Sequence, residues 1–174
     1  MCAIAPSPAV KTMEPQDERT WATFCHVASL LWIVLIPLSF FGLPVPPFLN
    51  LPGPLIVWLA RRDRSRLVDV HGRESMNFQI SLTIYGLVLL LLGLAITAVF
   101  LVLGLLYGSQ SGGQRDAAVL VGLLFAFAGG TLWIIIQLLL ALINLILVIV
   151  AAFSASNGQE FRYPLTIRLL PPPR

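Results

Sequence analysis

The sequence predicts an all-α membrane protein with four membrane segments, of which the first two form a helical hairpin around a proline-rich turn. Hydrophobic residues make up 57% of the 174 residues and charged residues only 11%. Asp, Glu, Lys and Arg are missing from three long tracts, between Arg19 and Arg61, from Ser75 to Gln114 and from Ala117 to Gln159. A bilayer core about 30 Å thick takes roughly 20 apolar residues per helix, so each tract is long enough to lie in lipid.

The first membrane segment is expected at about residues 20–39, after a flexible N-terminal tail over residues 1–16. The tail is polar, contains prolines and has no apolar stretch of the kind found in cleaved signal peptides. Asp17 is placed to cap the following helix, and Trp21 to sit at the membrane interface. Residues 17–170 then form a single integral membrane domain, followed by a short tail at 171–174.

The second segment, at about residues 45–60, has an unusual entry. The stretch from Phe40 to Pro54 contains five prolines and two glycines. Proline interrupts a helix but is tolerated at its first position, so the helix can restart near Pro54. A helix of roughly 11 residues rises only about 16 Å, less than a bilayer. The return leg therefore either crosses partly in extended form or is re-entrant, and both alternatives stay open.

The third and fourth segments are expected at about residues 76–107 and 131–156. The last apolar tract would exceed about 50 Å as one helix, so we expect a break or kink at Gly129–Gly130 and an inserted helix over residues 117–128. Asn157–Gly158 is a helix-ending pair. Beyond it, apolar and polar residues alternate, which predicts an extended tail lying on the interface.

A charged island from Arg61 to Glu74 separates the second and third segments. It holds eight of the chain's nineteen acidic and basic residues, five of them arginines. Loops rich in arginine and lysine face the cytoplasm, which places the island and both termini there. Arg61, Arg62, Arg64 and Arg66 are candidate contacts for lipid headgroups or a partner protein. The alternative is that they act only as the topology signal, and interleaved acidic residues argue against nucleic acid.

Several polar residues in or beside the apolar tracts are candidates for function or for helix packing. These are His26, His71, Glu74, Asn77, Ser81, Gln137 and Asn144. His71 and Glu74 would share a helix face, but two ligands do not make a metal site without a third, such as His26, so no metal is predicted. The alternative is that His71–Gly72 ends one local structure and Glu74 begins the next helix. His26 either serves a function within the membrane or makes one interhelical hydrogen bond. Asn77 with Ser81, and Gln137 with Asn144, are expected to bond between helices.

The chain has no motif of a known catalytic site, so it is predicted not to be an enzyme and to need no cofactor. A lipid-modifying activity at His71 and Glu74 is the weakest alternative. Its two cysteines, Cys2 and Cys25, are not expected to form a disulfide. Small residues four apart on the last tract, from Ala118 to Gly130, allow close helix contact. The expected partners are therefore the lipid bilayer and either further copies of the chain or other membrane proteins.

Four motifs in this order resemble a family of small bacterial multi-pass membrane proteins of unknown function, which is similar to the twenty-kilodalton Tic subunit of the chloroplast inner-envelope import machinery. The motifs are DERTWATFCHVASL, GPLIVWLARRD, VDVHGRESMNFQIS and SNGQEFRYPLTIRLL. The resemblance covers about residues 18–170 and implies the bacterial inner membrane. The positions that it marks are Trp21, His26, Pro54, Trp58, His71, Glu74, Asn77, Phe78, Asn157, Gly158, Tyr163 and Pro164.

Two functions follow as hypotheses. The first is a non-enzymatic accessory or assembly component of a membrane complex, based on the small-residue faces and the absence of a catalytic motif. The alternative is an oligomeric translocation or channel subunit for protein or solute, which only the resemblance to the Tic subunit implies. No charged residue lies inside the expected spans, which argues against an ion-coupled carrier.

Overall fold

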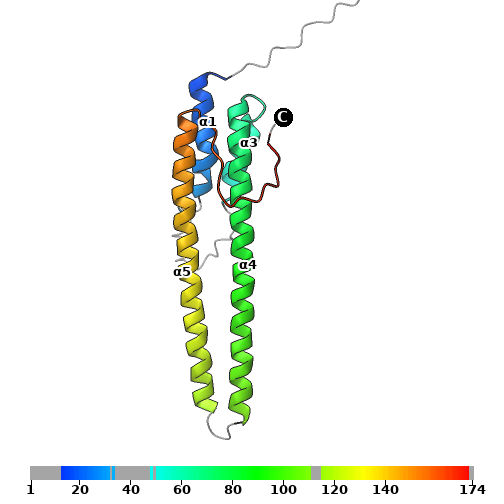
Figure 1. Cartoon of the computed structure of the whole chain (residues 1–174), viewed down its shortest axis with the longest axis vertical. Helices are drawn as coiled ribbons and strands as arrows, with labels where there is room; N and C mark the ends of the chain where they lie inside the picture. Colours follow the sequence, from blue (N-terminus) through cyan, green and yellow to red (C-terminus); the bar gives the residue numbers. More distant parts are fainter. Residues whose placement is uncertain (1–12, 32, 34–47, 49, 111–114, 173–174) are drawn as a thin grey trace, which may run out of the picture. The chain divides into compact units, whose positions relative to one another are not determined.

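The computed structural model describes residues 13–31, 33, 48, 50–110 and 115–172, and every regular element in these ranges is helical (Figure 1). In chain order the elements are α1 (Pro15–Val27), the 3-10 turn η1 (Ala28–Leu30), α3 (Pro52–Arg61), α4 (Arg66–Gln110) and α5 (Arg115–Ser156). Residues 157–172, called the C-terminal segment below, follow α5 without regular structure. The prediction of an all-α protein is confirmed for the described residues.

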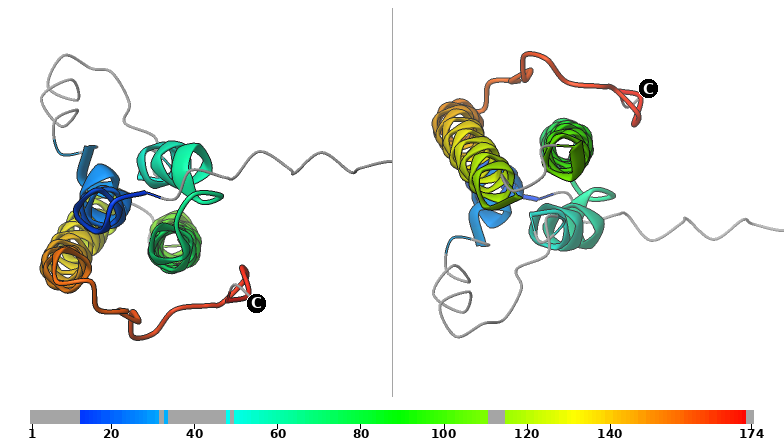
Figure 2. Two further views of the ribbon diagram at one scale, coloured as in Figure 1. Left: turned by 90° about the horizontal axis from the view of Figure 1, so that it is seen from above. Right: turned by 90° about the horizontal axis from the view of Figure 1, so that it is seen from below.

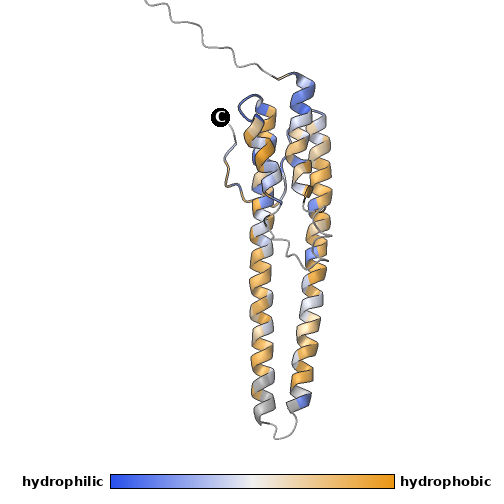
Figure 3. Cartoon of the chain, turned by 180° about the vertical axis from the view of Figure 1, so that it is seen from behind, coloured by the Kyte–Doolittle hydropathy of each residue, from blue (hydrophilic) through white to orange (hydrophobic). Residues whose placement is uncertain are grey.

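Two helices are long and apolar enough to cross a membrane, judged by length and composition. The qualifying stretches are Arg66–Gly104 of α4 and Val119–Ser156 of α5, and Figure 3 shows the apolar colouring along both. The helices α1 and α3 have 13 and 10 residues, fewer than the roughly 20 that a crossing takes. Four membrane segments are therefore not supported, and most of the proline-rich turn lies outside the described residues.

The helix α4 begins at Arg66, about ten residues before the expected start of the third segment. The reason is Ser65, whose side-chain oxygen accepts a hydrogen bond from the Val68 backbone N–H at 3.3 Å, as an N-terminal helix cap does. Asp69 in the first turn is favoured by the positive end of the helix dipole. The alternative in which His71–Gly72 ends one local structure is wrong, since His71, Gly72 and Glu74 all lie inside α4.

The helix α5 passes through Gly129–Gly130 without interruption, so the expected break there is absent and residues 117–128 belong to α5. Glycine costs a helix interior only about 1 kcal/mol relative to alanine. Breaking backbone hydrogen bonds in an apolar environment costs several kcal/mol for each unsatisfied group. Two glycines are therefore not enough to end this helix.

The chain divides into two compact units. Unit 1 comprises Met1–Ser81 and Leu145–Arg174, and unit 2 comprises Leu82–Asn144. Within unit 1, α1 packs against α3, and the end of α5 packs on α1, where Thr23 Oγ1 approaches the Ala152 carbonyl oxygen at 3.4 Å. The views along the helices in Figure 2 show the C-terminal segment leaving α5 and crossing to α4. The core of unit 1 consists of Ala22, Cys25, Trp58, Val68, Met76 and Ala155.

Glycines allow the helices of unit 1 to approach closely. A Cβ atom added to Gly72 would overlap the indole ring of Trp58, lying 2.5 Å from Cγ and 2.7 Å from Cβ. A Cβ atom on Gly53 would overlap the carbonyl oxygen of Ala28 in η1. Neither position has room for a larger side chain, because α3 packs directly against α4 at Gly72 and against η1 at Gly53.

Unit 2 is an antiparallel pair formed by the remainder of α4 and the first part of α5. The rings of Phe100 and Phe125 stack with centroids 4.6 Å apart. A Cβ atom on Gly93 would lie 3.7 Å from the Trp133 ring, and one on Gly129 would lie 3.9 Å from Thr97 Oγ1. Both glycines face the opposite helix, and a Cβ atom at either position would make an ordinary van der Waals contact with it.

Candidate functional site

Two histidines and a tyrosine form a buried polar cluster in unit 1, here called the His–His–Tyr cluster. His26 Nε2 lies 2.8 Å from His71 Nδ1, and His26 Nδ1 lies 2.9 Å from the Tyr163 hydroxyl. Both histidines are 0% exposed and Tyr163 is 3% exposed. The three residues come from α1, α4 and the C-terminal segment. The cluster therefore joins three parts of the chain that are far apart in sequence.

Helical spacing places His26 on the inner face of α1. Ala22, Cys25, His26 and Ser29 are all buried, and a spacing of three, four and seven residues puts them on one side of a helix. The Ser75 hydroxyl of α4 donates to the Cys25 carbonyl oxygen at 2.7 Å, which ties α4 to α1 beside the histidine pair. From the sequence, His26 was the residue that could have completed a metal site with His71 and Glu74 from another helix. In the structure His26 does lie beside His71, and the two side chains share a hydrogen bond.

Tyr163 is held by aromatic contacts as well as by its hydroxyl. Its ring stacks on Phe78 with centroids 4.0 Å apart and an interplanar angle of 7°, and Phe161 meets it edge-on at 5.1 Å. Burial, followed by the carboxylate of Glu74, raises the pKa of Tyr163 above its usual value near 10. The hydroxyl therefore keeps its proton throughout the physiological range.

Two buried polar atoms beside the cluster have no hydrogen bond among the described residues. They are His71 Nε2 and Glu74 Oε2, three residues apart on α4. The other Glu74 oxygen lies 4.0 Å from Arg168 Nε. In the part of the chain that the structure describes, no three His, Cys, Asp or Glu side chains are grouped as metal ligands.

Asn77 and Ser81 hold the C-terminal segment on α4. Asn77 Oδ1 accepts from the backbone N–H groups of Leu169 and Leu170 at 3.1 and 2.8 Å. Its Nδ2 donates to the Leu170 carbonyl oxygen at 2.9 Å, and Ser81 Oγ accepts from the Ile167 N–H at 2.8 Å. We expected both residues to bond between membrane helices, and they instead bind an extended backbone.

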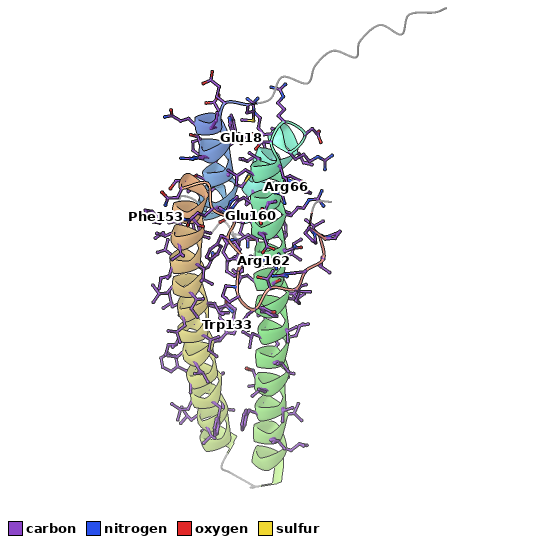
Figure 4. The ribbon with its side chains drawn as sticks, turned by 45° about the horizontal axis from the view of Figure 1, so that its top comes forward. Glu18, Arg66, Trp133, Phe153, Glu160 and Arg162 are labelled. Carbon is purple, nitrogen blue, oxygen red and sulfur yellow. The ribbon has the colours of Figure 1, made fainter. Side chains whose placement is uncertain are left out.

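Three of the four arginines expected to contact headgroups or a partner make contacts within the protein. Arg61 lies over the Trp21 ring at 4.4 Å, and Arg62 pairs with Asp63 at 3.6 Å. Arg66 pairs with Glu160 of the C-terminal segment at 3.4 Å, and both are labelled in Figure 4. Arg64 is exposed.

Arg73 also contributes to unit 1, although sequence reasoning did not select it. It donates to Asp69 Oδ1 at 2.9 Å, and its Nη1 donates to the Pro171 carbonyl oxygen at 3.0 Å. The same Asp69 oxygen accepts the Trp58 indole N–H at 2.8 Å. The four-residue spacing of Asp69 and Arg73 on a helix was the available signal.

The remaining two candidates, Gln137 and Asn144, lie on the α5 part of unit 2. Asn144 is buried at 4% exposure, and Gln137 is half-buried.

Comparison with known proteins identifies the family to which the chain belongs. Residues 17–170 match the MamF/MmsF family, described as the magnetosome magnetite crystal formation protein family. The chain belongs to the MamF/MmsF family. No curated protein and no solved structure matches it.

Membership in the MamF/MmsF family confirms the expectation of a small membrane-protein family covering most of the chain. The matched region begins at Asp17, which lies in the first turn of α1 and does not cap it as expected, and ends at Leu170, which Asn77 binds. It therefore includes the whole His–His–Tyr cluster. The family match does not support the expected similarity to the Tic subunit.

Proposed function

We propose that this protein is a non-enzymatic, integral membrane component that assists magnetite crystal formation as an accessory or assembly member of a membrane complex. The observation that carries the proposal is the family match over residues 17–170. The two long apolar helices support a place in the membrane. In this role the protein supplies a surface and a position, and it transforms no substrate.

The apolar surface of unit 2 supports the membrane part of this proposal. Large apolar side chains there are widely exposed, among them Phe127 at 76% and Leu124 at 67%. Soluble proteins rarely expose such contiguous apolar surface, whereas lipid tails or a neighbouring apolar helix would cover it. The occupants proposed for this surface are the lipid bilayer and other membrane proteins, further copies of the chain included.

The packing of unit 1 supports a structural role for its polar residues. His26 is completely buried and is engaged through both ring nitrogens. A general acid or base has to come within hydrogen-bond reach of its substrate, and His26 has no free nitrogen for one. A cluster of this kind specifies one arrangement of three chain segments.

The finer topology also belongs to the proposal. We retain four membrane segments with both termini in the cytoplasm, the first two forming a hairpin around the proline-rich turn. The absence of charged residues between Arg19 and Arg61 supports the first two segments. The five arginines of the following island support its place on the cytoplasmic side. Cysteine labelling from each side of the membrane, at Lys11, Ser111 and Arg174, would test on which side the two ends of the chain and the connection between α4 and α5 lie.

The decisive experiment removes the gene from its host. Electron microscopy should then show fewer or smaller magnetite crystals, with magnetosome membranes still present, and the wild-type gene should restore them. A host whose crystals are unchanged in number, size and shape would contradict the proposal. Crosslinking in native membranes, followed by purification, should recover a second copy or another membrane protein.

The translocation alternative has no independent support here. It predicts conductance when the purified protein is placed in liposomes, altered by Asn144→Ala or His26→Ala. The accessory role predicts bilayers without conductance, so this measurement separates the two functions.

A further inference from the structure

We propose that a groove between α1 and the end of α5 binds one phospholipid with an ethanolamine headgroup, whose phosphate lies on Arg19. This lipid site rests on the proposed place of unit 1 in the membrane, but not on the role in crystal formation.

The groove is open and lies within unit 1, where α1 runs beside the last turns of α5 (Figures 1 and 2). Its volume is about 600 Å³, within the range of roughly 300–1,000 Å³ that ligand sites occupy. In the proposed topology the first membrane segment begins near Thr20, and α5 ends at Ser156, so the groove opens at the depth of the cytoplasmic headgroups. The residues that line it include Gln16, Arg19, Thr20, Thr23, Phe24 and Ser156.

Arg19 supplies the positive charge of the groove. Its guanidinium reaches from α1 to the residues after α5, where Nε would lie 3.1 Å from a Cβ atom on Gly158. Gly158 has a φ of 74°, a left-handed conformation that glycine adopts readily, and its missing side chain leaves this space to the arginine. Among the described residues no carboxylate pairs with Arg19. The guanidinium is therefore available to a phosphate, which it can bind through two N–H groups.

Three hydroxyl groups line the groove as hydrogen-bond acceptors. Each donates its proton to a backbone carbonyl oxygen of the preceding turn. The three are Thr20, Thr23 and Ser156, with donor–acceptor distances of 2.9, 2.8 and 2.8 Å. A hydroxyl has one proton and two lone pairs, so these three offer a ligand only acceptor sites. An ethanolamine headgroup has an ammonium with three N–H donors beside its phosphate, whereas a choline headgroup has no N–H, so the acceptors favour ethanolamine.

The charge around the groove favours a zwitterionic headgroup over an anionic one. Asp17 and Glu18 lie in the first turn of α1, next to Arg19 in the chain. Their negative charges offset the attraction of Arg19 for a headgroup with net negative charge. The same carboxylates attract an ammonium group, so a headgroup that carries both charges fits this end of α1.

Exposed apolar side chains continue from the groove toward the membrane interior. Phe24, Val27 and Leu31 are exposed along α1 and the turn that follows it, at spacings of three and four residues, which places them on one side. On α5, Ile149 and Phe153 are exposed four residues apart, and Phe153 is labelled in Figure 4. Acyl chains would cover both rows. A polar opening above apolar rows fits a lipid better than a free phosphate compound.

Native mass spectrometry of the full chain, released from detergent micelles, tests the proposal. When phosphatidylethanolamine is added in increasing amounts, the wild type should bind one molecule more tightly than any further one. Phosphatidylglycerol and phosphatidylcholine should bind this site several-fold more weakly. Arg19→Gln should weaken binding of the ethanolamine lipid about fivefold, the scale of an exposed charge pair. The matched control Arg64→Gln removes the same charge from an exposed residue outside the groove and should leave binding unchanged.

Thr20→Val tests the acceptor role of the hydroxyls. It should reduce the preference for ethanolamine over choline and leave the affinity for the choline lipid unchanged. Both Arg19 and Thr20 are exposed, so the thermal midpoints of the lipid-free variants should equal that of the wild type.

Four results would overturn the proposal. The first is equal affinity for the three lipids, and the second is an equal loss in Arg19→Gln and Arg64→Gln. The third is competition by glycerophosphoethanolamine, which has the headgroup without acyl chains, at the same concentrations as the lipid. The fourth is a dimer peak that Arg19→Gln removes while the lipid adducts stay unchanged, because a second copy would then occupy the groove.

Discussion

Replacing Gly72 with alanine tests how closely α3 packs on α4. The added Cβ atom would lie 2.5 Å from Trp58 Cγ, whereas ordinary contacts begin at 3.4 Å. The two helices must therefore separate by roughly 1 Å or Trp58 must turn away, and overpacking of this kind costs about 1–3 kcal/mol. Turning Trp58 also breaks the bond of its indole N–H to Asp69, worth about 1.5–3 kcal/mol for a charged acceptor.

One effect acts in the opposite direction. Alanine is favoured over glycine inside a helix by about 1 kcal/mol. When Trp58 turns away, the net loss in the free energy of unfolding is then about 1.5–5 kcal/mol. For a chain of this size, it lowers the thermal midpoint by about 3–20 °C. Tryptophan fluorescence during heating, with the protein in detergent micelles, measures the change.

The matched control is Gly86→Ala on the same helix, because a Cβ atom there meets nothing within 4 Å. That variant should be as stable as the wild type or slightly more stable. Combining Gly72→Ala with Trp58→Ala removes the overlap with the indole ring and leaves only the contact with Cβ, so alanine at position 72 should cost less in that background. Equal midpoints for Gly72→Ala and Gly86→Ala would refute the packing argument.

Three further predictions use the same preparations. Gly129→Leu should destabilise the helix pair of unit 2 by about 1–3 kcal/mol, whereas Gly130→Leu, whose Cβ meets open space, should leave the thermal midpoint nearly unchanged. Asn77→Ala removes three hydrogen bonds to the C-terminal segment and should cost about 2–3 kcal/mol, measured by the same heating experiment; an unchanged midpoint would contradict it. Because the folded-state pKa of Tyr163 is raised, its contribution to stability is complete below about pH 10 and is lost as the pH rises above that. Wild type should therefore lose more stability than Tyr163→Phe between pH 9 and pH 11, and equal losses would show that Tyr163 is not the group responsible.

The long apolar helices could be predicted because charge is expensive in lipid, and its absence from a tract is visible in any sequence. The start of α4 was missed because the charged island resembles a loop. Its helix signal was local and subtle, a capping Ser65 followed by Asp69 in the first turn. Charge density alone does not distinguish a solvated helix from a loop.

The site could be predicted only in part. His26, His71 and Asn77 were selected because polar groups in apolar tracts need partners, but the sequence does not say which partners. Asn77 binds backbone groups 92 and 93 positions away, and every residue except proline offers the same N–H and C=O. The close-approach glycines, Gly53 and Gly72, carry no side chain whose chemistry would identify them.

The contact between Tyr163 and His26 joins residues 137 positions apart, which sets an order of events during synthesis. The ribosome makes α1 before α3, α4 and α5, and residue 163 only after α5. Until then His26 Nδ1 and the Asn77 side-chain amide lack the partners that they have in the folded protein. Unit 1 therefore matures late, and any factor that protects a nascent membrane protein would have to shelter these polar groups until the C-terminal segment arrives.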